Sequence, residues 1–184
     1  GDAPSGSPIT TWANWMHATA LINQAPAWSQ ALSASPGCTM APWGSSVNTS
    51  VVTISTNTWV QARRDQTGCA AIALQGMTLR LAADLTIVAD GVTSTNGLKV
   101  ISTDGQPHTL RLLMPGTAQT CASGRDITLL GGTTVDAAIA VQLFTPGKVV
   151  TNGPTQLSGK ITAGCLAATG QVHLTRAVVP TPGA

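Results

Sequence analysis

The sequence has no glutamate and no tyrosine, and it contains only one phenylalanine and three lysines. Charged residues make up 9% of its 184 residues, whereas an average soluble protein has roughly 25%. Because Glu and Lys are good helix formers, their scarcity argues against a helical bundle or a coiled coil. A surface with so little charge must be built from Thr, Ser, Asn, Gln and Gly, which is typical of a rigid extracellular β protein.

Long basic or apolar runs are also lacking. The net charge is +2, and no basic run is longer than Arg63-Arg64, so charge alone does not indicate binding to nucleic acid or an anionic membrane. No stretch of eighteen apolar residues and no signal-peptide pattern is present. We therefore expect that an export signal or membrane anchor has been removed, or that the chain is a mature ectodomain.

Recognisable catalytic motifs are missing as well. The sequence has neither a G-x-S-x-G elbow nor a DxDxDG calcium loop. A Ser–His–Asp triad is conceivable around His108 with Asp104 or Asp126, but we interpret His17, His108 and His173 as structural. The sequence thus predicts a protein that is not an enzyme and that has no cofactor and no metal.

The aspartates offer the main test of that prediction. Five of them fall at strand starts or turns, where carboxylates usually cap backbone amides: Asp84, Asp90, Asp104, Asp126 and Asp136. A secreted polysaccharide-active enzyme, the rival hypothesis, needs several acids clustered with an arginine in one groove. Scattered aspartates at turns favour a structural module instead.

The four cysteines are Cys38, Cys69, Cys121 and Cys165. None belongs to a C-x-x-C pair, and no histidine lies at metal-ligand spacing from them. Two disulfides and an oxidising compartment are the simplest interpretation. Three pairings are open, of which we favour Cys38–Cys69 with Cys121–Cys165.

The N-terminal region, residues 1–68, is rich in tryptophan. Trp12, Trp15, Met16 and Thr19 recur at helical spacing, and Pro26 should end or kink the helix. We expect this helix to pack onto a β core, with a carbohydrate-stacking face as the alternative. Residues 33–67 look like loops, interrupted by strands at 51–54 and 58–60.

Residues 69–184 repeat short apolar or alternating runs separated by Gly, Asp, Asn and Pro. The strands expected here cover 77–81, 84–88, 98–101, 108–113, 125–130, 140–144, 148–150, 156–161 and 171–175. Their shortness and their Gly- and Asn-rich turns favour a right-handed parallel β-helix, a β-solenoid that buries an aliphatic column. A β-sandwich is the alternative.

Several of these segments resemble a known family. Leu143–Gly153, followed by Leu157–Gly164 and by Ala167–Leu174, is similar to the closing rungs of β-solenoid domains in bacterial pilin-like, PilX-type surface proteins. Leu79–Val88 is similar to their first rung. The resemblance implies an extracellular minor pilin or pilus-associated adhesin of a type IV pilus. It also implies other pilin subunits as partners and membrane attachment only through an N-terminal anchor that the sequence lacks.

Candidate ligand-binding residues are the dispersed cations, which stacked rungs would align for DNA, carbohydrate or a host surface. They are Arg80, Lys99, Arg111, Arg125 and Lys148, with Lys160 and Arg176 further along the chain. Solvated charges that protect sheet edges are the simpler interpretation. A row of mid-strand threonines for ice or crystal binding is a further alternative: Thr78, Thr86, Thr109, Thr128 and Thr175.

Overall fold

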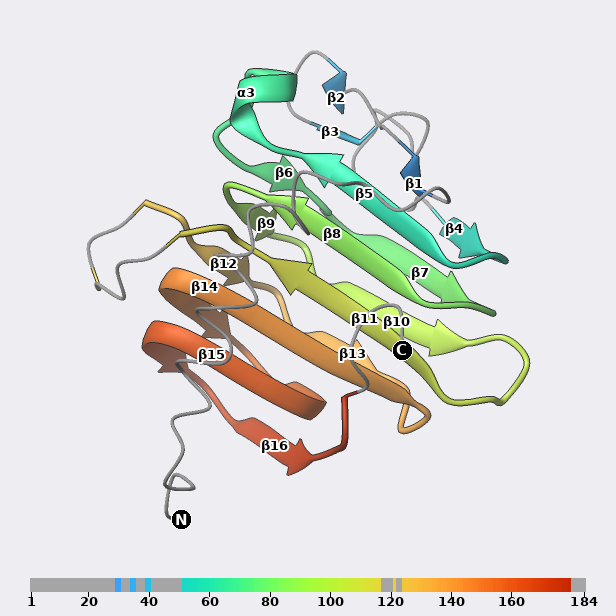
Figure 1. The fold of residues 1–184 in the computed structure, drawn as a ribbon. Coiled ribbons are helices and arrows are strands. Elements are labelled where there is room, and N and C mark those ends of the chain that lie inside the picture. Colours follow the sequence, from blue (N-terminus) through green and yellow to red (C-terminus); the bar gives the residue numbers. More distant parts are fainter. Residues whose placement is uncertain are drawn as a thin grey trace, which may run out of the picture.

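The computed structural model describes residues 29–30, 34–35, 39–40, 51–116, 121 and 124–179. Their strands stack into a β-solenoid, which runs from the blue-green end of the chain to the red end in Figure 1. Among the described strands only β2 (Ala34–Ser35) and β3 (Thr39–Met40) pair antiparallel. The mainly-β solenoid fold is therefore confirmed. The β-sandwich alternative is wrong, because a sandwich is built from antiparallel strands.

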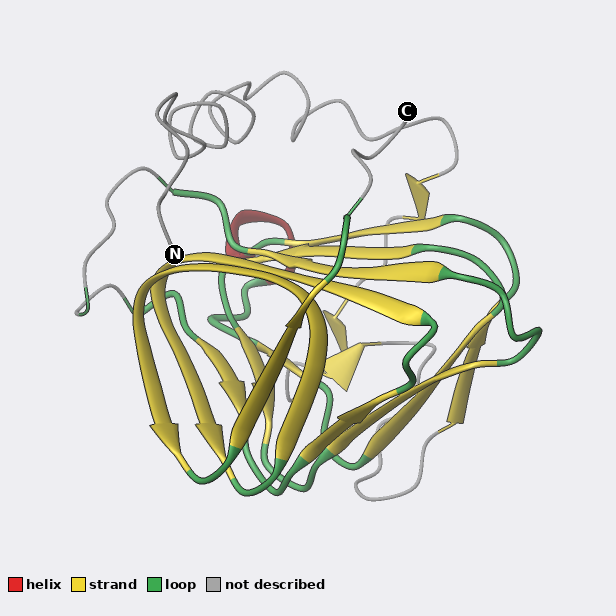
Figure 2. Ribbon diagram, turned by 90° about the horizontal axis from the view of Figure 1, so that it is seen from below, coloured by secondary structure: helices red, strands yellow, loops and turns green. Residues whose placement is uncertain are grey.

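Each turn of the solenoid passes through three faces, which give the cross-section in Figure 2. The first face contains β4 (Val51–Ile54), β7 (Met77–Leu81), β10 (Leu98–Ser102), β13 (Thr133–Val135), the start of β15 (Thr155–Thr169) and β16 (Val172–Arg176). The second contains β1 (Ser29–Gln30), β5 (Thr58–Ala62), β8 (Leu85–Ala89), β11 (His108–Leu113), the first half of β14 (Ile139–Asn152) and the middle of β15. The third contains β3, β6 (Ile72–Ala73), β9 (Val92–Ser94), β12 (Ile127–Leu129) and the ends of β14 and β15.

The rungs stack in register, so equivalent residues form columns. On the second face, Val60 pairs with Ile87, Ile87 with Leu112, Leu112 with Leu143, and Leu143 with Ile161. The first four of these are at most 1% exposed and belong to one aliphatic core. Because side chains alternate along a strand, each rung contributes every second residue to this column. The apolar–polar–apolar alternation in Leu85–Ile87, Leu110–Leu112 and Val141–Leu143 is the direct cause.

Two long strands bend through a corner without interruption, as the pair of curved ribbons in Figure 2 shows. β14 and β15 pair from Val141 with Gly159 to Asn152 with Thr169, with one irregularity between Thr145 and Lys148. Gly159 lies at the start of this ladder with φ of 149°, and a Cβ there would overlap the carbonyl oxygen of Val141. Only glycine permits this close approach of two rungs.

Two insertions interrupt the corner between the second and third faces. The first contains α3 (Arg64–Thr67), a four-residue helix that ends at Gly68 in the left-handed conformation. The second lies between β11 and β12 and contains Cys121. β4 and β5 pair with β7 and β8, so the solenoid includes residues that precede the boundary drawn at residue 69. The expected helix around Trp12 to Thr19 lies outside the described residues.

Candidate functional site

The outer surface of the first face is the most open polar surface among the described residues. Its longest outward column runs through Val51, Thr78, Lys99, Thr134, Gln156 and His173, which pair in register from rung to rung. All of these except Thr78 are exposed. Parallel strands hold them at the fixed spacing between rungs, which gives a flat face suited to an extended ligand.

Two shallow hollows lie along this face. One has a volume of about 370 Å³ and is lined by Thr78, Lys99 and Thr134 together with the glycine-rich corner at Gly97 and Gly132. The second has a volume of about 520 Å³ and is lined by Gln156, His173 and Thr175 and by apolar groups. The first presents hydroxyl, amide and amine groups, and the second presents hydroxyl, amide and imidazole groups, which are groups that can hold carbohydrate or phosphate ligands.

Of the five predicted ligand-binding cations, only Arg80 and Lys99 lie on the first face. Lys99 pairs with Thr78 and Thr134, while Arg80 pairs with Ile101 on the adjacent outward column. Both side chains are exposed and lie on neighbouring rungs. The structure therefore brings these two together on a surface that is open to a ligand, and their role in binding stays a prediction.

Arg111 lies on the second face and is 3% exposed. Its Nη1 donates to Asp84 Oδ2 at 3.1 Å. Burial lowers the pKa of Arg111, and the charge of Asp84 opposes that shift. Arg111 thus takes part in a buried ion pair between rungs and does not extend the exposed surface of Arg80 and Lys99.

The outer side of the second face is buried more widely. Trp59, Val88, Leu113 and Phe144 form a second apolar cluster and are at most 5% exposed. Their strands also point core residues inward, so β8 is buried along its whole length. The outer side of the second face is therefore buried and combines this apolar cluster with buried polar residues such as Arg111 and Gln142, whereas the outer side of the first face is exposed and mostly polar.

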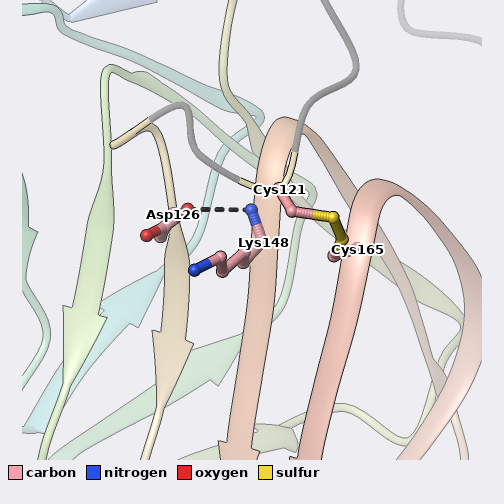
Figure 3. The surroundings of a disulfide bond; sticks show 4 residues. All are labelled: Cys121, Asp126, Lys148 and Cys165. Atoms are coloured by element: carbon pink, nitrogen blue, oxygen red, sulfur yellow. Dashed lines mark hydrogen bonds between the residues drawn. A yellow bond between two sulfur atoms is a disulfide. The ribbon is translucent and has the colours of Figure 1, made fainter.

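Arg125 and Lys148 lie at the corner between the second and third faces. Arg125 Nη2 is 3.7 Å from Asp90 Oδ1, and Arg125 Nη1 also donates to the carbonyl of Pro115. The backbone N–H of Lys148 donates to Asp126 Oδ1 at 2.8 Å (Figure 3). These two cations belong to a corner that joins rungs, apart from the pair on the first face.

The same corner carries a disulfide. Cys121 and Cys165 are bonded, with a Cα–Cα distance of 5.3 Å, and Figure 3 shows the bridge joining the inserted loop to β15 beside Lys148. This half of the expected pairing is confirmed. Cys69 is also disulfide-bonded, but Cys38 lies outside the described residues.

All five aspartates singled out from the sequence accept backbone hydrogen bonds. The donors are Thr109 to Asp84 (2.8 Å), Arg64 to Asp90 (2.6 Å), Gln106 to Asp104 (2.9 Å), Lys148 to Asp126 (2.8 Å) and Ala138 to Asp136 (3.1 Å). Asp84, Asp104 and Asp136 lie on successive rungs at the corner between the first and second faces, and Asp90 and Asp126 lie at the corner between the second and third faces. Each therefore acts as a turn or inter-rung cap.

Ser102, Asp104 and His108 converge at one corner. The sequence suggests a pairing of His108 with Asp104 or Asp126, and the structure places it beside Asp104, but the sequence does not single out Ser102. Asp104 Oδ1 lies 2.8 Å from His108 Nε2 and 3.1 Å from Ser102 Oγ. The hydroxyl of Ser102 also bonds the carbonyl of Gln106 at 3.0 Å. Nucleophilic catalysis requires a bond from serine to histidine, whereas here both bond the carboxylate. The four-residue spacing of Asp104 and His108 is the signal that points to this contact.

The mid-strand threonines do not form one row. Thr78 and Thr175 are on the first face, Thr86 and Thr109 are buried on the second, and Thr128 is on the third. In addition, among the described residues no three His, Cys, Asp or Glu side chains gather as a metal site would require, and no helix there has the length and apolar character to span a membrane.

Comparison with protein-family models, with curated proteins and with solved structures finds no match.

Proposed function

We propose that the chain is a non-catalytic, exported module of a bacterial surface appendage, acting as a minor pilin or a pilus-associated adhesin or assembly subunit. The observation that carries this proposal is the engagement of all five corner aspartates with backbone amides. Acids used in this way hold turns together. The two that have an arginine beside them, Asp84 with Arg111 and Asp90 with Arg125, do not line either hollow of the first face. A polysaccharide-active enzyme would require the opposite arrangement.

Two further features support an extracellular role. The disulfide between Cys121 and Cys165 suits an oxidising compartment. The exposed outer side of the first face is polar and flat, with Arg80 and Lys99 on neighbouring rungs. In this proposal the partners are other pilin subunits, and the first face binds a host surface, a carbohydrate or DNA.

The experiment is immunogold electron microscopy of intact cells that carry the native gene, with a deletion strain as the control. Gold on surface filaments, together with reduced piliation or adhesion of the deletion strain, is the expected result. Label confined to the cytoplasm would contradict the proposal.

A second assay addresses the enzyme hypothesis. The purified chain is incubated with a panel of bacterial and plant polysaccharides, and new reducing ends and unsaturated products are measured. We expect no turnover above a Ser102→Ala/Asp104→Asn/His108→Ala triple variant, which removes the three side chains that converge at one corner. Turnover by the wild type that the triple variant lacks would replace the adhesin proposal with a catalytic one.

A further inference from the structure

The two ends of the solenoid are finished differently. At the first rung, β1 and β3 pair beyond β5 and β6, and the inward residues Val52, Ile54 and Val60 are at most 9% exposed. At the last rung the inward residues Leu166 and Leu174 are 50% and 52% exposed. Figure 1 shows β15 and β16 as the outermost strands at that end.

The position of these leucines identifies them as core residues without a cover. Leu166 pairs with Val149, and Leu174 pairs with Leu157, both of which belong to the buried core. Ile161 continues the column of Leu143 and is only partly buried. Repeat proteins usually close such ends with a polar capping repeat. Here the apolar column stops at the surface.

A backbone edge surrounds this apolar end. Among the described strands, Lys160–Thr169 of β15 pair only with β14, and β16 pairs only with β15. From residue 161 to residue 172 the sequence contains no charge and no proline. Proteins protect edge strands with exactly those residues, or with bulges, because an unprotected edge pairs with another strand. Among the described residues, this edge therefore has no strand paired beyond it and offers room for one more.

The charge at this end has a single sign. After Asp136 the sequence contains no aspartate or glutamate, while Lys160 and Arg176 lie on the last two rungs. Burial, and then the proximity of Arg176, lower the pKa of Lys160. Two copies placed end to end would bring these two cations together. An acidic partner meets no such repulsion.

We propose that this open end binds one extended strand of a partner protein, apolar at alternate positions and carrying acidic residues. The strand continues the parallel sheets by backbone hydrogen bonds. The partner strand pairs along the edge Lys160–Thr169 of β15, so its inward apolar side chains cover Ile161 and Leu166 and meet Leu174 of β16 across the open end of the core. Its carboxylates face Arg176. This inference rests on the proposed role as an assembly module, since it names the surface through which the module joins its neighbour.

The test measures binding of three dye-labelled peptides to the purified chain by fluorescence anisotropy. The probe is a capped twelve-residue peptide that alternates Val or Leu with Thr and carries two aspartates. One control has lysines in place of the aspartates, and the other has the same composition with the alternation scrambled. We expect the acidic alternating peptide to bind about tenfold more tightly than either control.

Variants locate the site. Leu174→Asp, at a half-exposed side chain, should abolish binding, whereas Val51→Asp is the matched control because Val51 is 58% exposed at the opposite end. Arg176→Glu should reverse the preference, so that the lysine peptide binds more tightly than the aspartate peptide. Circular dichroism and thermal unfolding confirm that each variant keeps the fold of the wild type.

Three results would overturn the inference: equal binding of all three peptides, no binding, or binding that Leu174→Asp leaves intact. Sedimentation equilibrium on the wild type without peptide tests whether a second copy of the chain occupies the open end instead. A dimer that Leu174→Asp dissociates would assign the open end to a second copy. These measurements use the purified chain, so their failure leaves the localisation experiment on cells to decide the proposed function separately.

Discussion

Hydrogen bonds of single polar residues join the rungs of this solenoid in addition to the apolar core. Asp84 is the clearest example: its own N–H donates to Asn57 Oδ1 at 3.1 Å, and its carboxylate accepts from the N–H of Thr109 and from Arg111. Through its backbone N–H and its carboxylate, this one residue links three successive rungs. Because Arg111 is 3% exposed while Asp84 is more open, the arginine depends on its partner for compensation of a buried charge.

Replacing Asp84 by Asn should destabilise the chain by about 2 kcal/mol, because the amide keeps an acceptor for Thr109 but leaves Arg111 without its counter-charge. The measurement is urea unfolding at neutral pH. Asp136→Asn is the control, since Asp136 is exposed and caps only Ala138. Equal loss in the two variants would show that the ion pair contributes nothing beyond a turn cap.

The hydrogen bonds of Asp104 should make the stability of the fold depend on pH. The backbone N–H of Gln106, and then His108, lower the pKa of Asp104 from 3.8 to about 2. A carboxyl with a depressed folded-state pKa stabilises the fold fully above pH 3.8 and loses that contribution as the pH falls to about 2. The melting temperature of Asp104→Asn should therefore lie below that of the wild type at pH 6, and the difference should disappear by about pH 2. A difference that persists unchanged at pH 2 would contradict this assignment.

At the scale of elements, the alternating runs identified most strands. The strands expected at 51–54, 77–81 and 108–113 match β4, β7 and β11 exactly, and those at 98–101 and 171–175 match β10 and β16 to within one residue. The sequence missed β6, β9 and β13, which have two or three residues each. Segments this short carry too little alternation, and neighbouring rungs decide their conformation.

The long strands show the same limit of predicting strands from local sequence. The runs at 140–144 and 148–150 are one continuous strand, β14, and β15 extends through Gly164 and Ala167 to Thr169. Glycine and alanine have low strand propensity, so pairing with β14 imposes the extended conformation there. The Trp-rich helix expected to pack onto the β core lies outside the described residues and stays a prediction.

A substitution at Gly159 tests the close approach of β15 to the Val141 carbonyl of β14. Gly159→Ala should lower the free energy of unfolding by about 3 kcal/mol, because a Cβ overlaps the Val141 carbonyl and φ is 149°. Gly105→Ala is the matched control: it also has a positive φ, 70°, but a Cβ meets nothing within 4 Å. The control should lose about 1 kcal/mol. Similar losses in both variants would show that backbone conformation alone sets the cost.

For the whole molecule, the disulfide and the two unlike ends are the decisive features. The bridge between Cys121 and Cys165 closes a segment with a sequence separation of 44 and attaches an inserted loop to the last complete rung. The last rung also has the most exposed core residues, Leu166 and Leu174. The covalent link therefore lies next to the least protected part of the solenoid.

A Cys121→Ala/Cys165→Ala variant should lose about 4 kcal/mol of stability, the value expected from the entropy of a loop of this length. Denaturant unfolding of the oxidised wild type and the variant is the measurement, with circular dichroism in buffer to show that strand content is retained. If the variant and the wild type unfold at the same denaturant concentration, the bridge does not constrain the unfolded chain.

The sequence by itself determined the β class, the solenoid, most strand positions and the use of aspartates at corners. It did so because alternation with period two, glycine at tight turns and carboxylate caps are local properties. The tertiary structure alone decided which residues share a face. β10 begins 21 residues after β7, whereas β13 begins 35 residues after β10, so register is not readable from spacing. Arg80 and Lys99 therefore meet on an open surface while Arg111 is buried, because inter-rung hydrogen bonding, which is long-range, fixes the register.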